Sequence, residues 1–292
     1  MVQAARVQHP TRFLEPDVGV GSRLLGGAVG FAVAKASMAG LTPTGPMRDR
    51  LERVNHRGEP ITLAQGPAVV LGTLAGVATT PGLPRNVRRS GLLAVAASGA
   101  VGAYDDLYGS TDTKGLAGHL KSLARGEVTS GAVKVLAIGA TGVVAGAWSR
   151  GGRGGPVDAV LAGVVVAGSA NLLNLFDLRP GRATKVFLAA ALPAAVSRGT
   201  SGDLLSAPIG ASCALLDDDL HERSMLGDTG ANAVGAVLGT AVAATLSRRP
   251  LLLAAAAVVA LTLASERISF SEVIQRNSVL RAIDELGRRP AS

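Results

Sequence analysis

The apolar residues of this chain come in blocks of roughly 14 to 20 residues, separated by short polar stretches that contain glycine or proline. As helices, such blocks can cross a hydrocarbon core about 30 Å thick. With 48% hydrophobic and 17% charged residues, the 292-residue chain is too apolar for most soluble domains of its size. We therefore expect an all-α fold, a polytopic membrane bundle of about nine transmembrane helices, near residues 24–41, 63–80, 90–104, 131–148, 157–176, 184–198, 203–216, 230–246 and 250–265.

The remaining segments predict three parts of the chain. Residues 1–17 are expected to form an exposed N-terminal arm, residues 18–265 a transmembrane domain, and residues 266–292 a cytoplasmic tail. In this tail, apolar residues recur at near-helical spacing among arginines, which is typical of an amphipathic helix lying on a membrane surface. Its apolar residues are Val273, Ile274, Leu280, Ile283 and Leu286.

The net charge of +8 does not point to nucleic acid, because the basic residues are scattered and aromatic residues make up only 3% of the chain. Without aromatic side chains there is no platform on which bases could stack. Anionic lipid headgroups and phosphate-bearing substrates are the better match for the basic loops. The single cysteine, Cys213, excludes an internal disulfide and a cysteine-based zinc site.

The loops divide unequally between the two sides of a nine-span bundle. If the spans alternate, one face carries 16 of the Lys and Arg residues and the other carries 10, so the positive-inside rule makes the first face cytoplasmic, with the N-terminus outside and the C-terminus inside. The same face carries 17 of the 21 acidic residues, which membrane insertion does not explain. We therefore expect carboxylate chemistry on the face formed by residues 42–62, 105–130, 177–183, 217–229 and 266–292.

Two loops of this face contain the first candidate residues. In "RVNHRGEP", His56 and Arg57 precede the second apolar block. In "AYDDLYGSTDTKGLAGHLK", Asp105 and Asp106 stand side by side where the third block ends. Adjacent carboxylates near a low-dielectric region repel each other unless a cation or a proton offsets their charge. The basic residues that follow this pair are Lys114 and Lys121.

Two further loops add the remaining candidates. The segment "NLLNLFDLRPGR" places Asn171, Asn174 and Asp177 three residues apart, on one face of a helix end. In "MLGDTGANAVG", Asp228 sits in a glycine-rich turn before the eighth block. Each feature alone has an ordinary explanation, because charged residues at helix ends often anchor at headgroup depth and Gly-Asp turns are common in loops. Three aspartate-bearing loops on one face together indicate a common cation.

The order of these four segments resembles that of the polyprenyl-phosphate N-acetylhexosamine-1-phosphate transferase family. This family includes phospho-N-acetylmuramoyl-pentapeptide transferase and the UDP-GlcNAc:undecaprenyl-phosphate GlcNAc-1-phosphate transferases. The similarity extends from about residue 45 to residue 245. It implies an enzyme of cell-envelope glycan biosynthesis that transfers a sugar-1-phosphate from a UDP-sugar to polyprenyl phosphate at the inner membrane face. The reaction releases UMP and uses Mg²⁺.

The resemblance also implies roles for individual residues. Asp228 would be the main Mg²⁺ ligand, and Asp105 and Asp106 would lie beside the lipid phosphate, one of them as its base or as a partner of a metal ligand. Asp177 would act at the diphosphate and metal region or at the nucleotide. The residues expected to bind substrate are His56, Arg57, Lys114, Lys121, Asn171 and Asn174.

The chain departs from the family pattern in two places and leaves alternatives open. Pro180 stands where the family carries a second acidic residue, with Arg179 beside it, and the tail lacks a histidine-rich loop. The donor is therefore expected to differ from the usual UDP-amino sugar. Alternatively, the protein is a catalytically inactive relative that binds lipid phosphate as a scaffold or regulator of envelope assembly. A transporter is disfavoured because the acids gather in loops. The 38 glycines leave room for a homodimer.

Overall fold

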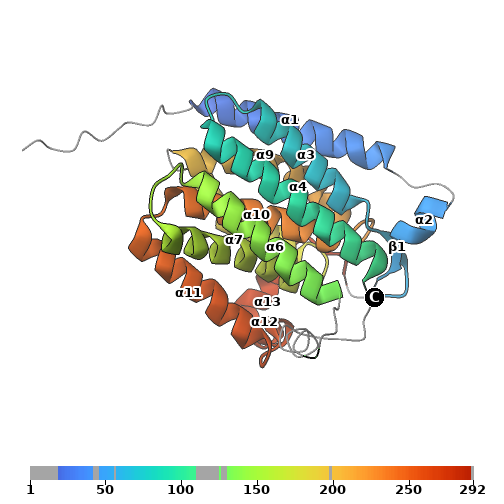
Figure 1. The fold of residues 1–292 in the computed structure, drawn as a ribbon. Helices are drawn as coiled ribbons and strands as arrows, with labels where there is room; N and C mark the ends of the chain where they lie inside the picture. Colours follow the sequence, from blue (N-terminus) through green and yellow to red (C-terminus); the bar gives the residue numbers. More distant parts are fainter. Residues whose placement is uncertain are drawn as a thin grey trace, which may run out of the picture.

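Long helices that lie side by side make up most of the chain (Figure 1). The computed structural model describes residues 19–41, 46–55, 57–109, 125, 130–196 and 199–290. The helices of the bundle are α1 (Val20–Gly40), α3 (Gln65–Thr79), α4 (Arg85–Tyr108), α6 (Ser130–Ser149), α7 (Pro156–Phe176), α8 (Arg182–Val196), α9 (Thr200–Leu220), α10 (Gly227–Thr245) and α11 (Arg248–Ser265).

The nine predicted apolar blocks coincide with these nine helices, so the helical fold is confirmed. Within the described residues, two helices are both long and apolar enough to cross a membrane, namely α7 and α11. Helices α3 and α8 have 15 residues each, which is shorter than the roughly 20 residues that a perpendicular span requires. Two of the nine predicted spans thus have the length and composition of a membrane helix, and the others are described as helices of the bundle.

Helix α10 forms the centre of the bundle and contacts α3, α4, α6, α7, α8 and α9. Its sequence is built almost entirely from Gly, Ala, Val and Thr, and nearly all of its residues are buried. Small side chains let neighbouring backbones come close to the helix axis. A Cβ atom at Gly235, for example, would collide with the backbone of Ser169 and Ala170 in α7. The residues of α10 are thus held in place by neighbours on every side.

The loop before α3 contains a small β-hairpin that the all-α prediction did not include. Strand β1 (Glu52–Val54) follows the short helix α2 (Pro46–Leu51) and pairs antiparallel with β2 (Pro60–Thr62). The turn between the strands is stabilised by the Asn55 side chain, whose oxygen accepts the backbone N–H of Arg57 and of Glu59, both at 2.9 Å. The carbonyl of Thr62 in turn accepts the Met225 N–H at 2.9 Å, which attaches the hairpin to the turn between α9 and α10.

The C-terminal tail forms two short helices, α12 (Phe270–Arg276) and α13 (Ser278–Glu285), where the sequence predicts an amphipathic helix. Asn277 lies between the two helices with extended backbone angles, and its side-chain oxygen caps α13 by accepting the N–H groups of Val279 and Leu280. A residue that competes for backbone hydrogen bonds in this way favours a helix start over a helix interior.

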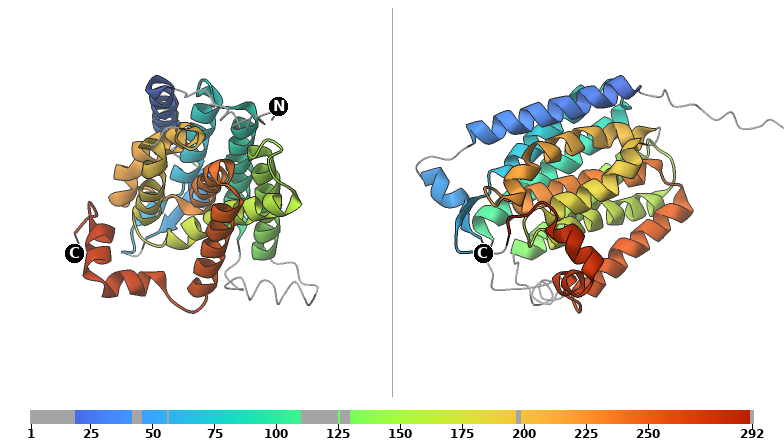
Figure 2. Two further views of the ribbon diagram at one scale, coloured as in Figure 1. Left: turned by 90° about the vertical axis from the view of Figure 1, so that its left-hand side faces the viewer. Right: turned by 180° about the vertical axis from the view of Figure 1, so that it is seen from behind.

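The tail folds back onto the end of the bundle that carries the hairpin (Figure 2). Arg182, the first residue of α8, donates to both oxygens of Asp284 at 2.8 and 2.9 Å, and both side chains are 3% exposed. Phe270 stacks on Phe176 with ring centroids 5.2 Å apart. Lys185 donates to carbonyls at the end of α13, including that of Asp284 at 2.8 Å. These contacts dock the tail through a buried charge pair.

Breaking this pair is expected to release the tail. In Asp284→Asn the buried Arg182 guanidinium loses its counter-ion, which typically costs about 3–5 kcal/mol. We expect trypsin to cleave the tail at least tenfold faster than in the wild type, as measured by mass spectrometry of the digest. Glu272→Gln is the matched control, because its pairing with Arg276 is exposed and contributes little. Equal cleavage rates in the two variants would contradict the docking role of Asp284.

Candidate functional site

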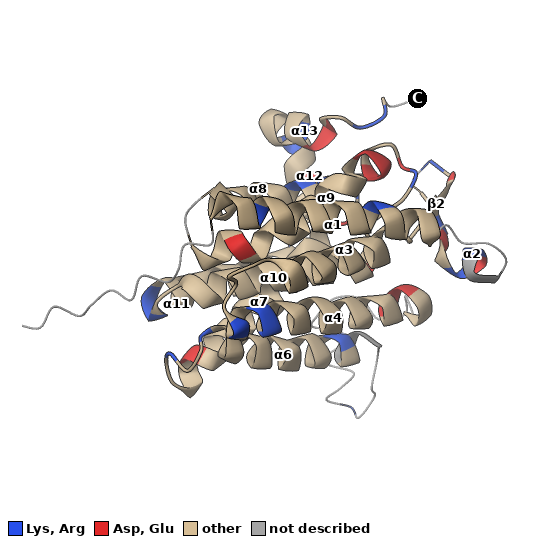
Figure 3. Cartoon of the chain, turned by 90° about the horizontal axis from the view of Figure 1, so that it is seen from above, with Lys and Arg blue, Asp and Glu red and all other residues tan. Residues whose placement is uncertain are grey.

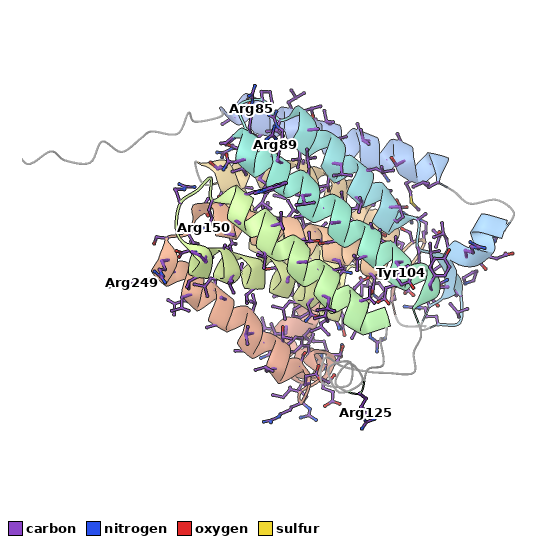
Figure 4. All side chains as sticks on the ribbon, viewed as in Figure 1. Arg85, Arg89, Tyr104, Arg125, Arg150 and Arg249 are labelled. Carbon is purple, nitrogen blue, oxygen red and sulfur yellow. The ribbon has the colours of Figure 1, made fainter. Side chains whose placement is uncertain are left out.

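Most of the acidic residues that the structure describes gather at the end of the bundle that holds the hairpin and the tail (Figure 3). Figure 4 shows Tyr104, the neighbour of Asp105, at this end of α4, whereas Arg85, Arg89, Arg150 and Arg249 lie toward the opposite end of the bundle. The site is therefore formed where α4 ends and α10 begins.

The two adjacent aspartates lie in the last turn of α4 and contact different partners. Successive residues of an α-helix point about 100° apart, so Asp105 and Asp106 face different neighbours. The Asp105 carboxylate accepts a hydrogen bond from the Lys134 ammonium in α6 at 3.0 Å. The Asp106 carboxylate faces the first turn of α10. Separate partners explain how the chain tolerates two neighbouring carboxylates.

Asp106 caps the N-terminus of α10. Its oxygens accept the backbone N–H groups of Asp228 at 3.0 Å and Thr229 at 2.9 Å, and the Thr229 hydroxyl at 2.6 Å. A carboxylate at this position satisfies N–H groups that have no partner within the helix and interacts favourably with the helix dipole. Gly227 makes the turn possible, because its φ of +62° lies in the left-handed region. Asp106 thereby fixes the backbone that carries Asp228.

The close approach of α4 to the start of α10 depends on Gly102. A Cβ atom at this position would collide with the backbone of Asp228 and Thr229. Gly66, at the start of α3, is similarly close to the backbone around Leu226 and Gly230. Three helices thus meet at the glycine-rich turn with no room for a side chain between them.

Lys134 joins the carboxylates of Asp105 and Asp228. Its ammonium group donates to both, and the Lys134 side chain is only 15% exposed. Lys134 is not among the residues predicted from the sequence because it lies inside an apolar block, although a lone cation in such a block is itself a signal of function. Two carboxylates converge at this position, where the sequence predicts a metal cation. In the structure, the Lys134 ammonium contacts both carboxylates.

Asp177 follows α7 directly and lies close to the same turn. Burial raises the pKa of Asp177 well above its usual range, and the charges of Asp219 and Asp228 act in the same direction, while a hydrogen bond from the Gly227 N–H opposes the shift. Asp219 was not selected from the sequence. Its carboxylate accepts the Gly181 N–H at 2.8 Å and the Thr184 hydroxyl at 3.0 Å, which anchors the turn between α7 and α8 beside Asp177.

The two asparagines before Asp177 lie along α7. Asn174 accepts the Asp177 N–H through its backbone carbonyl at 3.0 Å. Asn171 instead donates its side-chain amide to the Thr262 hydroxyl of α11 at 3.4 Å. Each step of three residues falls about 60° short of a full helical rotation, so Asn171 and Asp177 are about 120° apart around the axis. This rotation explains why Asn171 faces α11.

Arg57 is held at the edge of the site by Glu222. The Arg57 guanidinium donates to the Glu222 carboxylate at 2.9 Å, and the Asn55 amide donates to its other oxygen at 2.7 Å. Glu222 is 5% exposed and has a φ of +58°, an unusual conformation for a residue with a side chain. Of the other residues expected to bind substrate, His56, Lys114 and Lys121 lie outside the described residues.

The aspartates of the site provide oxygen ligands of the kind that a metal cation needs. Among the residues that the structure describes, no three His, Cys, Asp or Glu side chains gather as metal ligands. Asp105 and Asp228 nevertheless converge on one point, that of the Lys134 ammonium. Mg²⁺ is commonly bound by one or two carboxylates, with water and substrate phosphates completing its shell. The two carboxylates fit that pattern, with Lys134 as the competing cation.

In comparisons with known proteins, no family model matches the chain, and no curated sequence matches it either. The resemblance noted above therefore depends on the four sequence segments. Asp105, Asp177 and Asp228, which come from three of these segments, lie around the Gly227 turn. The segment RVNHRGEP lies next to these aspartates, since Val54 and Asn55 line the same small hollow as Asp177.

Filling the contact at Gly102 should separate α4 from α10. We expect Gly102→Ala to lower the melting temperature by several degrees, because overpacking costs about 1–3 kcal/mol. The matched control is Gly139→Ala in α6, where an added Cβ meets no other atom within 4 Å and the gain in helix propensity should leave stability unchanged or higher. A scanning-calorimetry result in which both variants melt alike would contradict the proposed close approach.

The raised pKa of Asp177 should make stability depend on pH. The folded protein holds the Asp177 proton more tightly than the unfolded chain, so the free energy of unfolding should fall as the pH rises above about 3.8 toward the raised pKa. Asp177→Asn removes this loss. We expect the variant to gain about 2 °C or more on the wild type between pH 4 and pH 7.5. A difference in melting temperature that stays constant over this range would disagree with the shift.

Proposed function

We propose that the protein is a multi-pass membrane transferase that acts on a lipid phosphate at one face of the bilayer. Apolar surface supports the membrane location: only 11% of the apolar stretch of α11 is buried, and its exposed residues include Leu252, Leu253 and Leu263. A soluble protein rarely exposes an apolar helix of this length. We place the aspartate end of the bundle at the cytoplasmic face of the cell membrane, with the N-terminus outside and the C-terminus inside.

The proposed reaction transfers a sugar-1-phosphate from a UDP-sugar to polyprenyl phosphate in cell-envelope glycan synthesis. An oxygen of the lipid phosphate forms a bond to the β-phosphorus of the donor, and the bond from that phosphorus to the UMP oxygen breaks. The observation that carries this proposal is the convergence of Asp105 and Asp228 on a single cation position. Phosphoryl transfer needs mainly positioning and charge neutralisation, and the lipid phosphate is already an anion.

The residues of the site divide into binding and positioning roles. Asp105 and Asp228 would hold Mg²⁺, which supplies charge neutralisation where the two phosphorylated substrates meet. Asp106 is a positioning residue, because its oxygens are engaged with the backbone and hydroxyl of the α10 N-terminus. We assign Asp177 to the diphosphate side of the donor, together with Asn174. Lys134 balances the carboxylate pair when the substrates are absent.

An inactive relative that binds lipid phosphate as a scaffold is the second candidate. The contact of Lys134 with both Asp105 and Asp228 favours it, because a protein cation there can replace a catalytic metal permanently. Pro180, which stands where the family carries a carboxylate, also favours the inactive relative. The two candidates differ in one respect that can be measured, namely the release of UMP.

The test supplies the purified protein in detergent with polyprenyl phosphate, Mg²⁺ and a panel of UDP-sugars, and measures UMP. We expect release with at least one donor, and a loss of about 100-fold or more in Asp105→Asn and Asp228→Asn, as is typical when a group that stabilises developing charge is removed. Asp217→Asn is the control, because this exposed carboxylate pairs with Arg223 and His221 away from the turn.

If no donor gives UMP release in a protein that still binds polyprenyl phosphate, the result would favour the scaffold. UMP release that Asp228→Asn leaves unchanged would contradict the assigned site while keeping the reaction.

A further inference from the structure

Four arginines from three distant segments line one cavity of about 580 Å³ beside the candidate site. Arg57 comes from the hairpin turn, Arg179 from the turn between α7 and α8, and Arg288 and Arg289 from the end of the tail. Cavities of roughly 300–1,000 Å³ are typical of small-molecule sites. The sequence predicts that Arg57 binds substrate, and Arg179 departs from the family pattern, but no local pattern places either residue beside the tail.

Three of these arginines are held in fixed positions. Arg57 is paired with Glu222 at 2.9 Å. Arg288 donates to the Pro180 carbonyl at 2.8 Å and to Asp284 at 2.7 Å. The Arg289 guanidinium donates to both oxygens of Glu59, at 2.6 and 3.2 Å. A site whose cations are already oriented loses little side-chain entropy when an anion binds.

The fourth arginine, Arg179, is not held by a carboxylate or a carbonyl among the described residues. Arg179 is exposed, and within the described part of the chain its guanidinium makes no hydrogen bond or ion pair. Glu222, Asp284 and Glu59 offset the charges of Arg57, Arg288 and Arg289, so Arg179 is the cavity arginine that no ion pair among the described residues offsets. The remaining acid of the cavity lining is Glu285. Burial lowers the pKa of Arg288, the paired Asp284 carboxylate opposes this shift, and the like charges of Arg182 and Arg179 add to it. Arg179 therefore offers a guanidinium that an anion can contact without first breaking an ion pair.

The cavity continues toward the aspartates. A second hollow of about 270 Å³ shares Arg179, Pro180 and Glu222 with the first and is lined by Asp177 as well. A ligand whose anionic group lies among the arginines can therefore extend toward Asp177 without leaving the protein surface.

We propose that this arginine cavity, closed by the C-terminal tail, is a binding site for a diphosphate-bearing ligand. Guanidinium groups match phosphate oxygens with paired hydrogen bonds, and four of them around one space suit two linked phosphates better than a single carboxylate. The cavity itself carries this inference. Only the identification of the ligand as the nucleotide-sugar donor rests on the proposed function. The phosphate groups of anionic lipids are the other source of the same chemistry.

The experiment measures binding rather than turnover. Isothermal titration calorimetry of the full-length protein in detergent, with pyrophosphate and with UDP, gives dissociation constants for the wild type and for Arg179→Gln. Because Arg179 has no partner in the described fold, the variant should keep its melting temperature. We expect its binding to weaken by about tenfold or more. Arg281→Gln, which changes an exposed arginine of α13 outside the cavity lining, is the matched control and should bind as the wild type does.

A second arm identifies the source of the phosphate. The wild type and Arg179→Gln are placed in nanodiscs of phosphatidylcholine with or without phosphatidylglycerol, and their melting temperatures are compared. Arg179-dependent binding of pyrophosphate or UDP supports a soluble ligand. Arg179-dependent stabilisation by phosphatidylglycerol alone supports a lipid phosphate at the same site and overturns the diphosphate assignment. Absence of both effects, or effects that Arg179→Gln does not alter, would overturn the proposal.

The result also separates this inference from the proposed function. Binding without UMP release would leave the cavity in place and remove the transfer reaction. UMP release in a protein whose affinity for UDP is unaffected by Arg179→Gln would keep the transfer reaction and remove the ligand site in the arginine cavity.

Discussion

The cap that Asp106 places on α10 is the interaction on which the rest of the site depends. Asp106 lies in the last turn of α4 and binds the first turn of α10, so it fixes the position of Asp228 relative to α4. This contact requires Gly102, because any side chain there would separate the two helices, and Gly227, whose left-handed φ turns the backbone N–H groups toward Asp106. Since α10 contacts six other helices, its N-terminus sets where the surrounding loops can meet.

Charge balance is the second constraint at this end of the bundle. Asp105 and Asp228 share the ammonium of Lys134, Asp219 is satisfied by backbone and hydroxyl donors, and Asp177 has its pKa raised by burial and by neighbouring carboxylates. A site that gathers this many carboxylates favours the binding of a further cation. The neighbouring cavity contributes Arg179, whose charge no ion pair in the described fold offsets. An anionic substrate at Arg179 and a divalent cation at Asp105 and Asp228 would balance each other's charge.

Much of this arrangement can be predicted from the sequence, because apolar blocks separated by glycine and proline fix where helices begin and end. All nine blocks became helices, and Asp105, Asp177 and Asp228 lie near one turn. Local pattern could not show that adjacent aspartates diverge, since that follows from helical rotation at the last turn of α4. Nor could it pair Lys134 with Asp228, which lies 94 residues away. The division of the tail at Asn277 was missed because periodic apolar residues continue across the cap.

The convergence of Asp105 and Asp228 on one cation position is tested most directly by Mn²⁺ binding, followed by electron paramagnetic resonance of the purified protein without substrates. We expect one Mn²⁺ site per chain that Asp228→Asn removes. Lys134→Met should bind Mn²⁺ at least tenfold more tightly, because the competing ammonium is gone and both carboxylates become available. Unchanged Mn²⁺ affinity in Lys134→Met, or a site that survives in Asp228→Asn, would contradict the assignment of these three side chains to a single cation site.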